Sequence, residues 1–321
     1  MDEPVAPPPP TRARRRARPV TVVVLALLPW TWYLWRNLTG GINFFSVAIP
    51  LLVALVTGVF VFAAIAARRW WPLIVAASLL LFGVSAVALP RMPQSSPTPV
   101  DPFRIASANV YDGNRDPGDA ATAIAGTGAE VLISVETPNL FQDELAAAAG
   151  PSYRYGYAGP WFAVRSKFPV QPLADPAGLP EHEVAVLRLS PPGVPALTVF
   201  VVHALNPAFE TSFSEQQAFI EDLASAAVQA QASGPVAIAG DLNLSDRTHG
   251  YRILIGDFRD GMRAGHWARD TYIRGSWGAA YLRIDHIFVS PTWCAENPFR
   301  YFIPGSDHQG VTTMLGPCPS G

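Results

Sequence analysis

The stretch Val236-Ala237-Ile238-Ala239-Gly240-Asp241-Leu242-Asn243 decides how the rest of the chain is interpreted. It is a short apolar run that ends in a glycine, a carboxylate and a carboxamide, a pattern typical of a buried strand entering a turn. Such a turn places Asp241 and Asn243 where a strand meets solvent, which is where α/β sheets carry their ligands. Taken alone, Gly-Asp-Leu-Asn is equally typical of an ordinary turn held by side-chain hydrogen bonds.

Three apolar runs stand out in the first ninety residues of a chain in which 50% of the residues are hydrophobic. They span 19–35, 44–67 and 71–89, contain no charged residue, and approach the roughly 20 residues that a helix needs to cross a bilayer. They predict three transmembrane helices. The alternative for the first run is a cleaved signal peptide with a basic segment before it. The tryptophans and tyrosine at its end instead favour an aromatic belt at a membrane interface.

The arginines predict the orientation of these helices. Five arginines lie within 12–18 and Arg68-Arg69 separates the second run from the third, whereas the first hairpin contains only Arg36. The positive-inside rule then places the N-terminus in the cytoplasm and everything after residue 89 outside the plasma membrane. We expect four parts: a disordered cytoplasmic tail (1–18), the three helices (19–89), a Pro/Ser linker (90–100) and an extracytoplasmic domain (101–321).

Charge and cysteine content narrow the class of the outer domain. Residues 1–100 carry a net charge of +7, whereas residues 101–321 carry 14 Lys and Arg against 23 Asp and Glu, a net charge of −9. Nucleic-acid-binding domains normally present a basic surface, so the acidic balance disfavours a nucleic-acid partner. The two cysteines, Cys294 and Cys318, are candidates for a disulfide in an oxidising compartment, with two free thiols as the alternative.

Strands outnumber helices after residue 101. We expect a helix over 117–127 and a second helix opened by the capping box Ser212-Phe213-Ser214-Glu215. Since several strands follow one another directly, the pattern favours an α+β fold in which two packed sheets are flanked by helices. The expected strands are 103–110, 130–135, 184–189, 197–203, 236–241 and 282–290, with a hairpin over 153–166.

Polar side chains follow many of these predicted strands. Each has an ordinary structural interpretation, such as a turn residue or the histidine at the end of a strand. Their order along the chain, however, resembles the endonuclease/exonuclease/phosphatase superfamily, which implies a DNase I-like four-layered α/β sandwich. The matching pieces are Ser107-Ala108-Asn109-Val110, Val135-Glu136, Ser166-Lys167-Phe168-Pro169, Val202-His203, Gly240-Asp241-Leu242-Asn243, Arg283-Ile284-Asp285-His286-Ile287 and Ser306-Asp307-His308.

The resemblance implies a site for a divalent cation. Mg²⁺ (or Mn²⁺) prefers oxygen ligands and keeps several waters, so one carboxylate and one or two further oxygens suffice. By resemblance, Glu136 would be the principal metal ligand, with Asn109 and Asp307 in or near the coordination shell.

The resemblance also implies roles in phosphoester hydrolysis. Asp241 would orient or deprotonate the attacking water, Asn243 would bind a phosphoryl oxygen, and His308, oriented by Asp285, would stabilise the transferring phosphoryl group. His203 would be a second histidine at the phosphate. The chain departs from the family pattern in having no evident acidic partner for His203 within 153–161, and Ser134-Val135 replaces the usual Gln before the metal-binding Glu.

The substrate does not follow from the superfamily alone. The predicted topology and length are similar to those of VanJ-type membrane proteins associated with teicoplanin resistance in actinobacteria. This similarity implies a membrane-anchored phosphohydrolase acting on a lipid-linked envelope phosphate such as undecaprenyl pyrophosphate. Two alternatives stay open: an anchored extracellular nuclease, which the acidic domain disfavours, and a catalytically silent protein that binds an envelope component.

Overall fold

The computed structural model describes residues 12–35, 43–138, 140–174, 178–207, 209–273 and 281–319. The chain forms two compact units, 1–39 with 48–87 and 40–47 with 88–321. The first unit contains α1 (Arg12–Trp35), most of α2 (Asn43–Ala67) and α3 (Trp71–Ala88). The first turn of α2 belongs to the second unit.

The prediction of three membrane helices is corrected to two candidate spans among the described residues. These are Phe45–Ala67, with a mean hydropathy of 2.6, and Trp71–Arg91, with 2.4. In α1 the described side chains form a shorter apolar helix, Val20–Thr31, which is below the length of a membrane span. Two apolar helices of this length fit a membrane anchor. They also fit a helical hairpin buried inside a protein.

Apolar side chains hold the first unit together. Ile49 and Val53 of α2 pack against Phe82 and Ala86 of α3, with Trp30 of α1 beside them. The indole nitrogen of Trp30 donates a hydrogen bond to Ser78 Oγ (3.1 Å), which satisfies its polar atom in an apolar setting.

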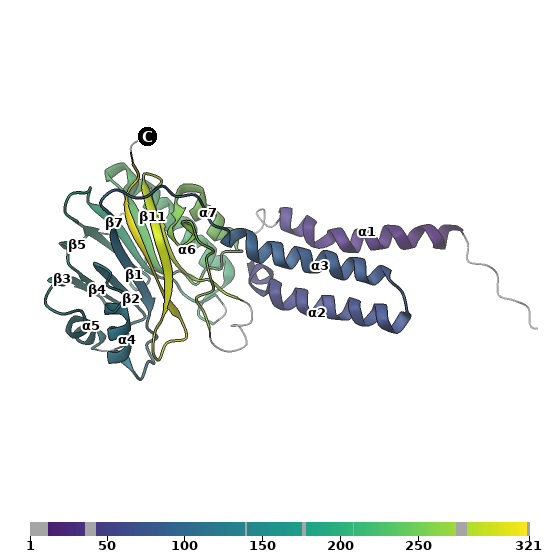
Figure 1. The fold of residues 1–321 in the computed structure, drawn as a ribbon, viewed down its shortest axis with the longest axis horizontal. Helices are drawn as coiled ribbons and strands as arrows, with labels where there is room; N and C mark the ends of the chain where they lie inside the picture. The colour runs from purple at the N-terminus through teal and green to yellow at the C-terminus, as the bar shows by residue number, and fades with distance from the viewer. Residues whose placement is uncertain are drawn as a thin grey trace, which may run out of the picture. The chain divides into compact units, whose positions relative to one another are not determined.

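The second unit is a sandwich of two six-stranded sheets (Figure 1). The first sheet has the order β11-β12-β1-β2-β4-β3 and the second β5-β6-β7-β8-β10-β9. The strands of the first sheet are β1 (Phe103–Asn109), β2 (Val131–Val135), β3 (Tyr155–Ala158), β4 (Phe162–Ser166), β11 (Trp293–Phe302) and β12 (Gln309–Pro317). Those of the second are β5 (Val170–Pro172), β6 (Val184–Leu189), β7 (Leu197–His203), β8 (Val236–Asp241), β9 (Arg259–Asp260) and β10 (Asp285–Val289).

Side chains that alternate between the two faces of each strand allow four layers to pack, two sheets with helices on their outer faces. Ile105 of β1 and Val199 of β7 lie in the core between the sheets. Their neighbours Ala106 and Phe200 face outward, because successive side chains on a strand point to opposite faces. The outward faces are covered by α4 (Pro117–Ala125) and α5 (Phe141–Ala149) on the first sheet, and by α6 (Phe213–Ala230) and α7 (His249–Asp257) on the second. The predicted two-sheet sandwich flanked by helices is confirmed.

Local signals predicted most of these elements. The capping box at Ser212 is present, with Ser212 Oγ accepting from Glu215 N and the Glu215 side chain accepting from Ser212 N. The expected hairpin turns at Gly159, whose N–H and carbonyl both bond Phe162. The pattern missed β11 and β12, because neither follows a clean alternation, and it missed α5 and α7, which are nine residues each.

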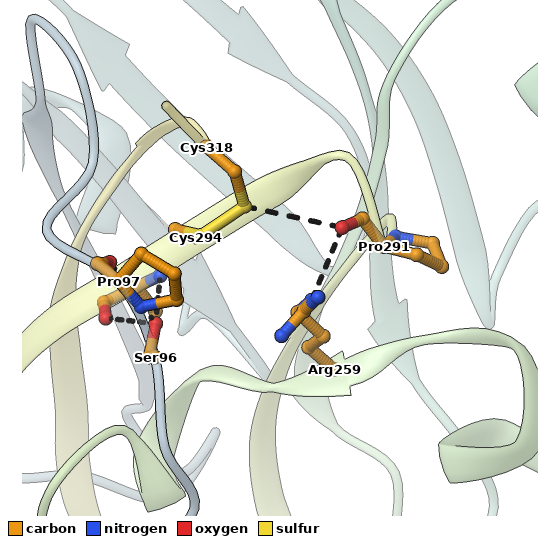
Figure 2. Close-up of a disulfide and its surroundings, with 7 residues drawn as sticks. Ser96, Pro97, Arg259, Pro291, Cys294 and Cys318 are labelled. Carbon is orange, nitrogen blue, oxygen red and sulfur yellow. Dashed lines mark hydrogen bonds between the residues drawn. A yellow bond between two sulfur atoms is a disulfide. The ribbon is translucent and has the colours of Figure 1, made fainter. Parts of the chain in front are cut away.

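The Pro/Ser stretch 90–100 differs from the spacer expected from its composition. Its backbone follows the sandwich, with Gln94 N bonded to Arg263 O (2.7 Å) and Val100 N to Pro317 O (2.8 Å). Ser96 Oγ donates to Ala295 O (2.7 Å) and accepts from Ala295 N (3.1 Å) beside the Cys294–Cys318 disulfide (Figure 2). The pairing of the two cysteines resolves the alternative left open by the sequence, and the segment 90–100 belongs to the domain.

Candidate active site

The polar residues predicted from the sequence converge at one end of the two sheets. In the second sheet, His203 of β7 and Asp285 of β10 both pair in register with Asp241 of β8. In the first sheet, Asn109 of β1 pairs with Val135 of β2, the residue before Glu136. Strand register thus places these side chains at the same end of two packed sheets, although they lie far apart in the sequence.

Direct contacts join the two sheets at this end. Asn109 Nδ2 donates to Asp241 Oδ2 (2.9 Å), and His308 Nδ1 lies 2.9 Å from Asp285 Oδ2. The other ring nitrogen, His308 Nε2, is 3.7 Å from Asp241 Oδ2. All four side chains belong to buried residues. We call Asn109, Asp241, Asp285 and His308 the catalytic cluster.

The backbone of the Gly240–Asn243 turn explains its residue types. Gly240 has a φ of +146°, and a Cβ there would lie 1.9 Å from the carbonyl oxygen of Val202 on the adjacent strand. Asn243 adopts the left-handed conformation (φ 47°), which Asn tolerates better than most residues. Its N–H donates to Asp241 Oδ1 (2.8 Å) and its Nδ2 to Ala204 O (2.8 Å). The segment is therefore both a side-chain-stabilised turn and the carrier of Asp241.

His203 has the acidic partner that the sequence did not reveal. Its Nε2 lies 3.5 Å from Glu136 Oε2, and its ring is stacked at a tilt beside Trp161, with 6.4 Å between centroids. Glu136 has a φ of 52°, a conformation that costs a non-glycine residue free energy and is concentrated at functional sites. The partner of His203 is therefore not in 153–161, where it was expected, but is the predicted metal ligand Glu136 itself.

Burial and neighbouring charges set the protonation of the catalytic cluster. Burial raises the pKa of Asp241 to about 6, with the charge of His308 opposing the rise and that of Asp285 adding to it. Burial alone would lower the pKa of His308, but Asp285 and Asp241 outweigh it and raise the pKa to about 10. At neutral pH, His308 is therefore an imidazolium, and it lies beside Asp241, whose pKa is close to neutral.

The second histidine and carboxylate stabilise each other's charge. Burial raises the pKa of Glu136, but hydrogen bonding to His203 and the charge of that histidine bring it below its ordinary value. Burial lowers the pKa of His203, and the hydrogen bond to Glu136 with the charge of Asp241 raises it above its ordinary value.

Two residues of the matching motifs lie outside these contacts. Among the described residues, no hydrogen bond or ion pair joins the Asp307 side chain to Asn109 or Glu136, so its role as a metal ligand stays a prediction. His286 is buried in the second sheet, bonds Leu244 O (2.8 Å), and has a pKa lowered by burial to about 4. It is therefore a neutral structural histidine.

Sequence reasoning missed residues that hold the catalytic cluster in place. Thr271 Oγ1 accepts from both Ile284 N and Asp285 N (3.1 Å each) at the start of β10. The ring of Tyr272 packs edge-on against that of His308, with 5.3 Å between centroids. Both precede β10 in a segment without a recognisable pattern, so no sequence signal identified them.

The oxygen atoms of the site fit a hard divalent cation. Asp241, Asp285 and His308 bring potential ligand atoms within 4.8 Å of one another. Because His308 is protonated, only the two carboxylates can serve as ligands, and Asp285 Oδ1 is buried with no hydrogen-bond partner. Glu136 and Asn109 add further oxygens at the facing sheet. Since carboxylate and amide oxygens suit Mg²⁺ or Mn²⁺, the residues present fit the cation that the resemblance implies.

The four-layered sandwich brings acidic and histidine side chains to one end of both sheets, the order and fold expected from the resemblance. Consistent with this, residues 106–308 match the model of the Endonuclease/Exonuclease/phosphatase family, and the chain belongs to that family. No curated protein matches the sequence.

Solved structures share the fold at low identity. D. rerio TDP2 complexed with single-strand DNA product is 16% identical (TM-score 0.53), with 68% of this chain and 100% of that chain covered. An endonuclease/exonuclease/phosphatase from Bacteroides vulgatus is 14% identical (0.52; 68% and 100% covered). Sphingomyelinase C from Streptomyces griseocarneus is 17% identical (0.50; 67% and 99% covered). At these identities the similarity establishes the fold.

Proposed function

We propose that this chain is a membrane-anchored, divalent-metal-dependent hydrolase of phosphoesters or pyrophosphates whose substrate is a lipid-linked envelope phosphate. The observation that carries the hydrolase part is the geometry of the catalytic cluster. A protonated histidine held by Asp285 (2.9 Å) lies beside Asp241 (3.7 Å), whose pKa is about 6.

These residues supply an acid and a base for in-line attack on phosphorus. Asp241, ionised above about pH 6, accepts a proton from the attacking water or orients it. His308 places its positive charge at the transferring phosphoryl group, and its Nε2–H, 3.7 Å from Asp241 Oδ2, would donate to the leaving oxygen while Nδ1–H donates to Asp285. A bound Mg²⁺ or Mn²⁺, held by Glu136 with Asn109 and Asp307 nearby, would offset charge on the phosphoryl oxygens.

His203 and Asn243 complete the proposed phosphate site. The contact with Glu136 and the charge of Asp241 outweigh burial and raise the pKa of His203, which favours its charged form beside the phosphate. Asn243 has its Nδ2 bonded to Ala204 O, so its carboxamide is held rigidly at the edge of the turn. We propose that it contacts a phosphoryl oxygen from this position.

The helices support a location at the plasma membrane. If α2 and α3 cross the bilayer, Arg68-Arg69 between them lie on the cytoplasmic side by the positive-inside rule. The domain that follows α3 then lies outside the cell, whether or not α1 also crosses.

Phosphate release by the full-length protein in detergent tests this proposal. The substrates are a lipid pyrophosphate, a phospholipid, a nucleotide and supercoiled DNA, each with Mg²⁺, Mn²⁺ or EDTA. We expect hydrolysis of the lipid pyrophosphate that EDTA abolishes and that His308→Ala lowers by about 10²–10⁴-fold. The control is His266→Ala, which removes an exposed histidine outside the site.

Each alternative has its own outcome in this assay. Plasmid nicking that is faster than lipid turnover and lost in His308→Ala would establish the nuclease instead. Activity that survives EDTA would contradict the metal. No hydrolysis of any substrate, with an unaltered envelope phenotype in Asp241→Ala and His308→Ala cells, would leave the silent binding protein.

A further inference from the structure

An apolar pocket adjoins the segment 240–247, which carries Asp241 and which we call the catalytic turn. It has a volume of about 70 Å³, and none of the ten residues that line it is charged. Asn243 and Ser245 of the catalytic turn form one edge, and Tyr272, whose ring packs against His308, forms another. A molecule with its phosphate at His308 would therefore extend its remaining part along this pocket.

One wall of the pocket comes from the first turn of α2. Val47 lines the pocket and packs against Leu282 and Ile284, which are 8% and 7% exposed. Val47 is also the third residue of the apolar span Phe45–Ala67. The same residue thus belongs to the pocket wall and to a helix long enough to cross a bilayer.

Arg247 attaches this turn of α2 to the catalytic turn. Its Nε donates to Ser46 O (3.0 Å) and its Nη2 to Val47 O (3.0 Å), and the residue is only 3% exposed. Ser46 O is available because Pro50, four residues later in α2, has no N–H to donate to it. The proline therefore creates the acceptor that holds the pocket wall in place.

Phe209 lines the same pocket with an 80% exposed side chain. Large exposed apolar side chains beside an apolar pocket mark surfaces that contact an apolar ligand or a membrane. A nucleotide or polyanion would require cationic or densely hydrogen-bonding walls, whereas the polar lining here is limited to asparagine and serine side chains and one tyrosine.

We propose that this pocket binds the hydrocarbon chain of an amphiphilic phosphoester whose phosphate lies at the catalytic cluster. The proposal rests on the proposed hydrolase function and adds to it the surface that recognises the substrate: the pocket binds the hydrocarbon chain while the catalytic cluster binds the phosphate. Phe209, Val47 and Leu282 are its specificity-determining residues.

A pair of chromogenic diesters tests the pocket, with methyl 4-nitrophenyl phosphate and octyl 4-nitrophenyl phosphate as substrates of the full-length protein in lipid nanodiscs. Phe209→Ser should lower the octyl-to-methyl ratio of kcat/KM by about tenfold, because several methylenes lose an apolar contact. The control Val228→Ser removes another exposed apolar side chain, near the end of α6, and should leave the ratio unchanged. An unchanged ratio in Phe209→Ser overturns the proposal while the hydrolase function stands.

A binding measurement tests the pocket independently of hydrolysis. If the wild type hydrolyses neither diester, the hydrolase proposal fails for such substrates, and calorimetric titration with octylphosphonate and methylphosphonate decides the pocket, with empty nanodiscs as the partition control. We expect octylphosphonate to bind the wild type at least about tenfold more tightly, and Phe209→Ser to abolish that preference. Equal affinities for the two phosphonates in the wild type overturn the proposal.

Discussion

The second unit contains two clusters of buried charged side chains, which differ in how their carboxylates are neutralised. The arginine cluster comprises Arg91, Asp246, Asp260 and Arg283. Arg283 Nη2 lies 2.7 Å from Asp260 Oδ2, and Arg91 Nε lies 2.7 Å from Asp246 Oδ2. In the catalytic cluster, two carboxylates instead share the single ring of His308.

The pKa values of one carboxylate from each cluster show the effect of these different partners. Burial raises the pKa of Asp246, but Arg91, Arg283 and Arg247 outweigh burial and hold it below its ordinary value. Burial raises the pKa of Asp241 to about 6, and one histidine does not compensate it. A carboxylate with its own guanidinium stays permanently charged, whereas one that shares a histidine exchanges protons near neutral pH. The first arrangement suits structure and the second suits catalysis.

The largest expected effect comes from removing the charge that orients His308. Asp285→Asn should lower kcat by about 10²–10⁴-fold, because the imidazolium loses its charged acceptor. It should also move the alkaline limb of the pH–rate profile to lower pH, since Asp285 raises the pKa of His308. The measurement is a pH–rate profile beside that of Asp270→Asn, a partly exposed aspartate outside the cluster. Equal profiles for both variants would remove Asp285 from the mechanism.

The next largest effect is on folding. Arg283→Met leaves Asp260 without its guanidinium and Asp246 without one of two, which should lower the free energy of unfolding by about 3–5 kcal/mol. Urea denaturation of the full-length protein measures it. Arg300→Met, which breaks a partly exposed pair with Asp270, should cost below about 1 kcal/mol. A loss as small as this in Arg283→Met would contradict the structural role of the arginine cluster.

The smallest expected effect is on the pH dependence of the free energy of unfolding, which should have opposite signs in the two clusters. The pKa of Asp241 is about 6 in the folded protein and about 3.9 in unfolded chains. The folded state therefore binds more protons between these values, and the wild type loses stability as pH rises through this window. Asp241→Asn does not titrate, so it should gain about 3 kcal/mol over the wild type at pH 8 and lose this advantage below about pH 4.

Asp246→Asn is the matched variant for that measurement. Because the folded pKa of Asp246 is lowered, its contribution to stability is present at pH 8 and disappears as pH falls through the acidic range. This variant should therefore be less stable than the wild type at pH 8, with the difference shrinking in acid. The readout is the urea midpoint at pH 4, 6 and 8. The same sign in both variants would refute the distinction between the clusters.

The sequence predicted the catalytic cluster better than the arginine cluster for a physical reason. Asp241, Asp285 and His308 each occur in a short motif at a strand end, so local patterns and motif order identify them. Arg91 and Asp246 are 155 residues apart and meet only because 90–100 follows the sandwich. Arg283 stands within a matching motif, but nothing local marks it as buried. Pairing across such separations depends on strand register and chain path, which composition does not specify.

The partner of His203 was missed for a related reason. The family pattern predicted an acidic residue within 153–161, whereas Glu136 reaches His203 from the facing sheet. The same limit applies to the first turn of α2. Its apolar sequence predicted a membrane helix and concealed that Val47 also packs in the domain.

The position of β12 has a consequence for the order of events during synthesis. β12 inserts between β11 and β1, and Thr312 Oγ1 donates to Ile105 O across 207 residues. His308 immediately precedes β12. The first sheet therefore stays divided, and the catalytic histidine is absent, until nearly all of the domain has left the ribosome. Such distant pairing folds slowly, so the candidate site stays incomplete until β12 is in place.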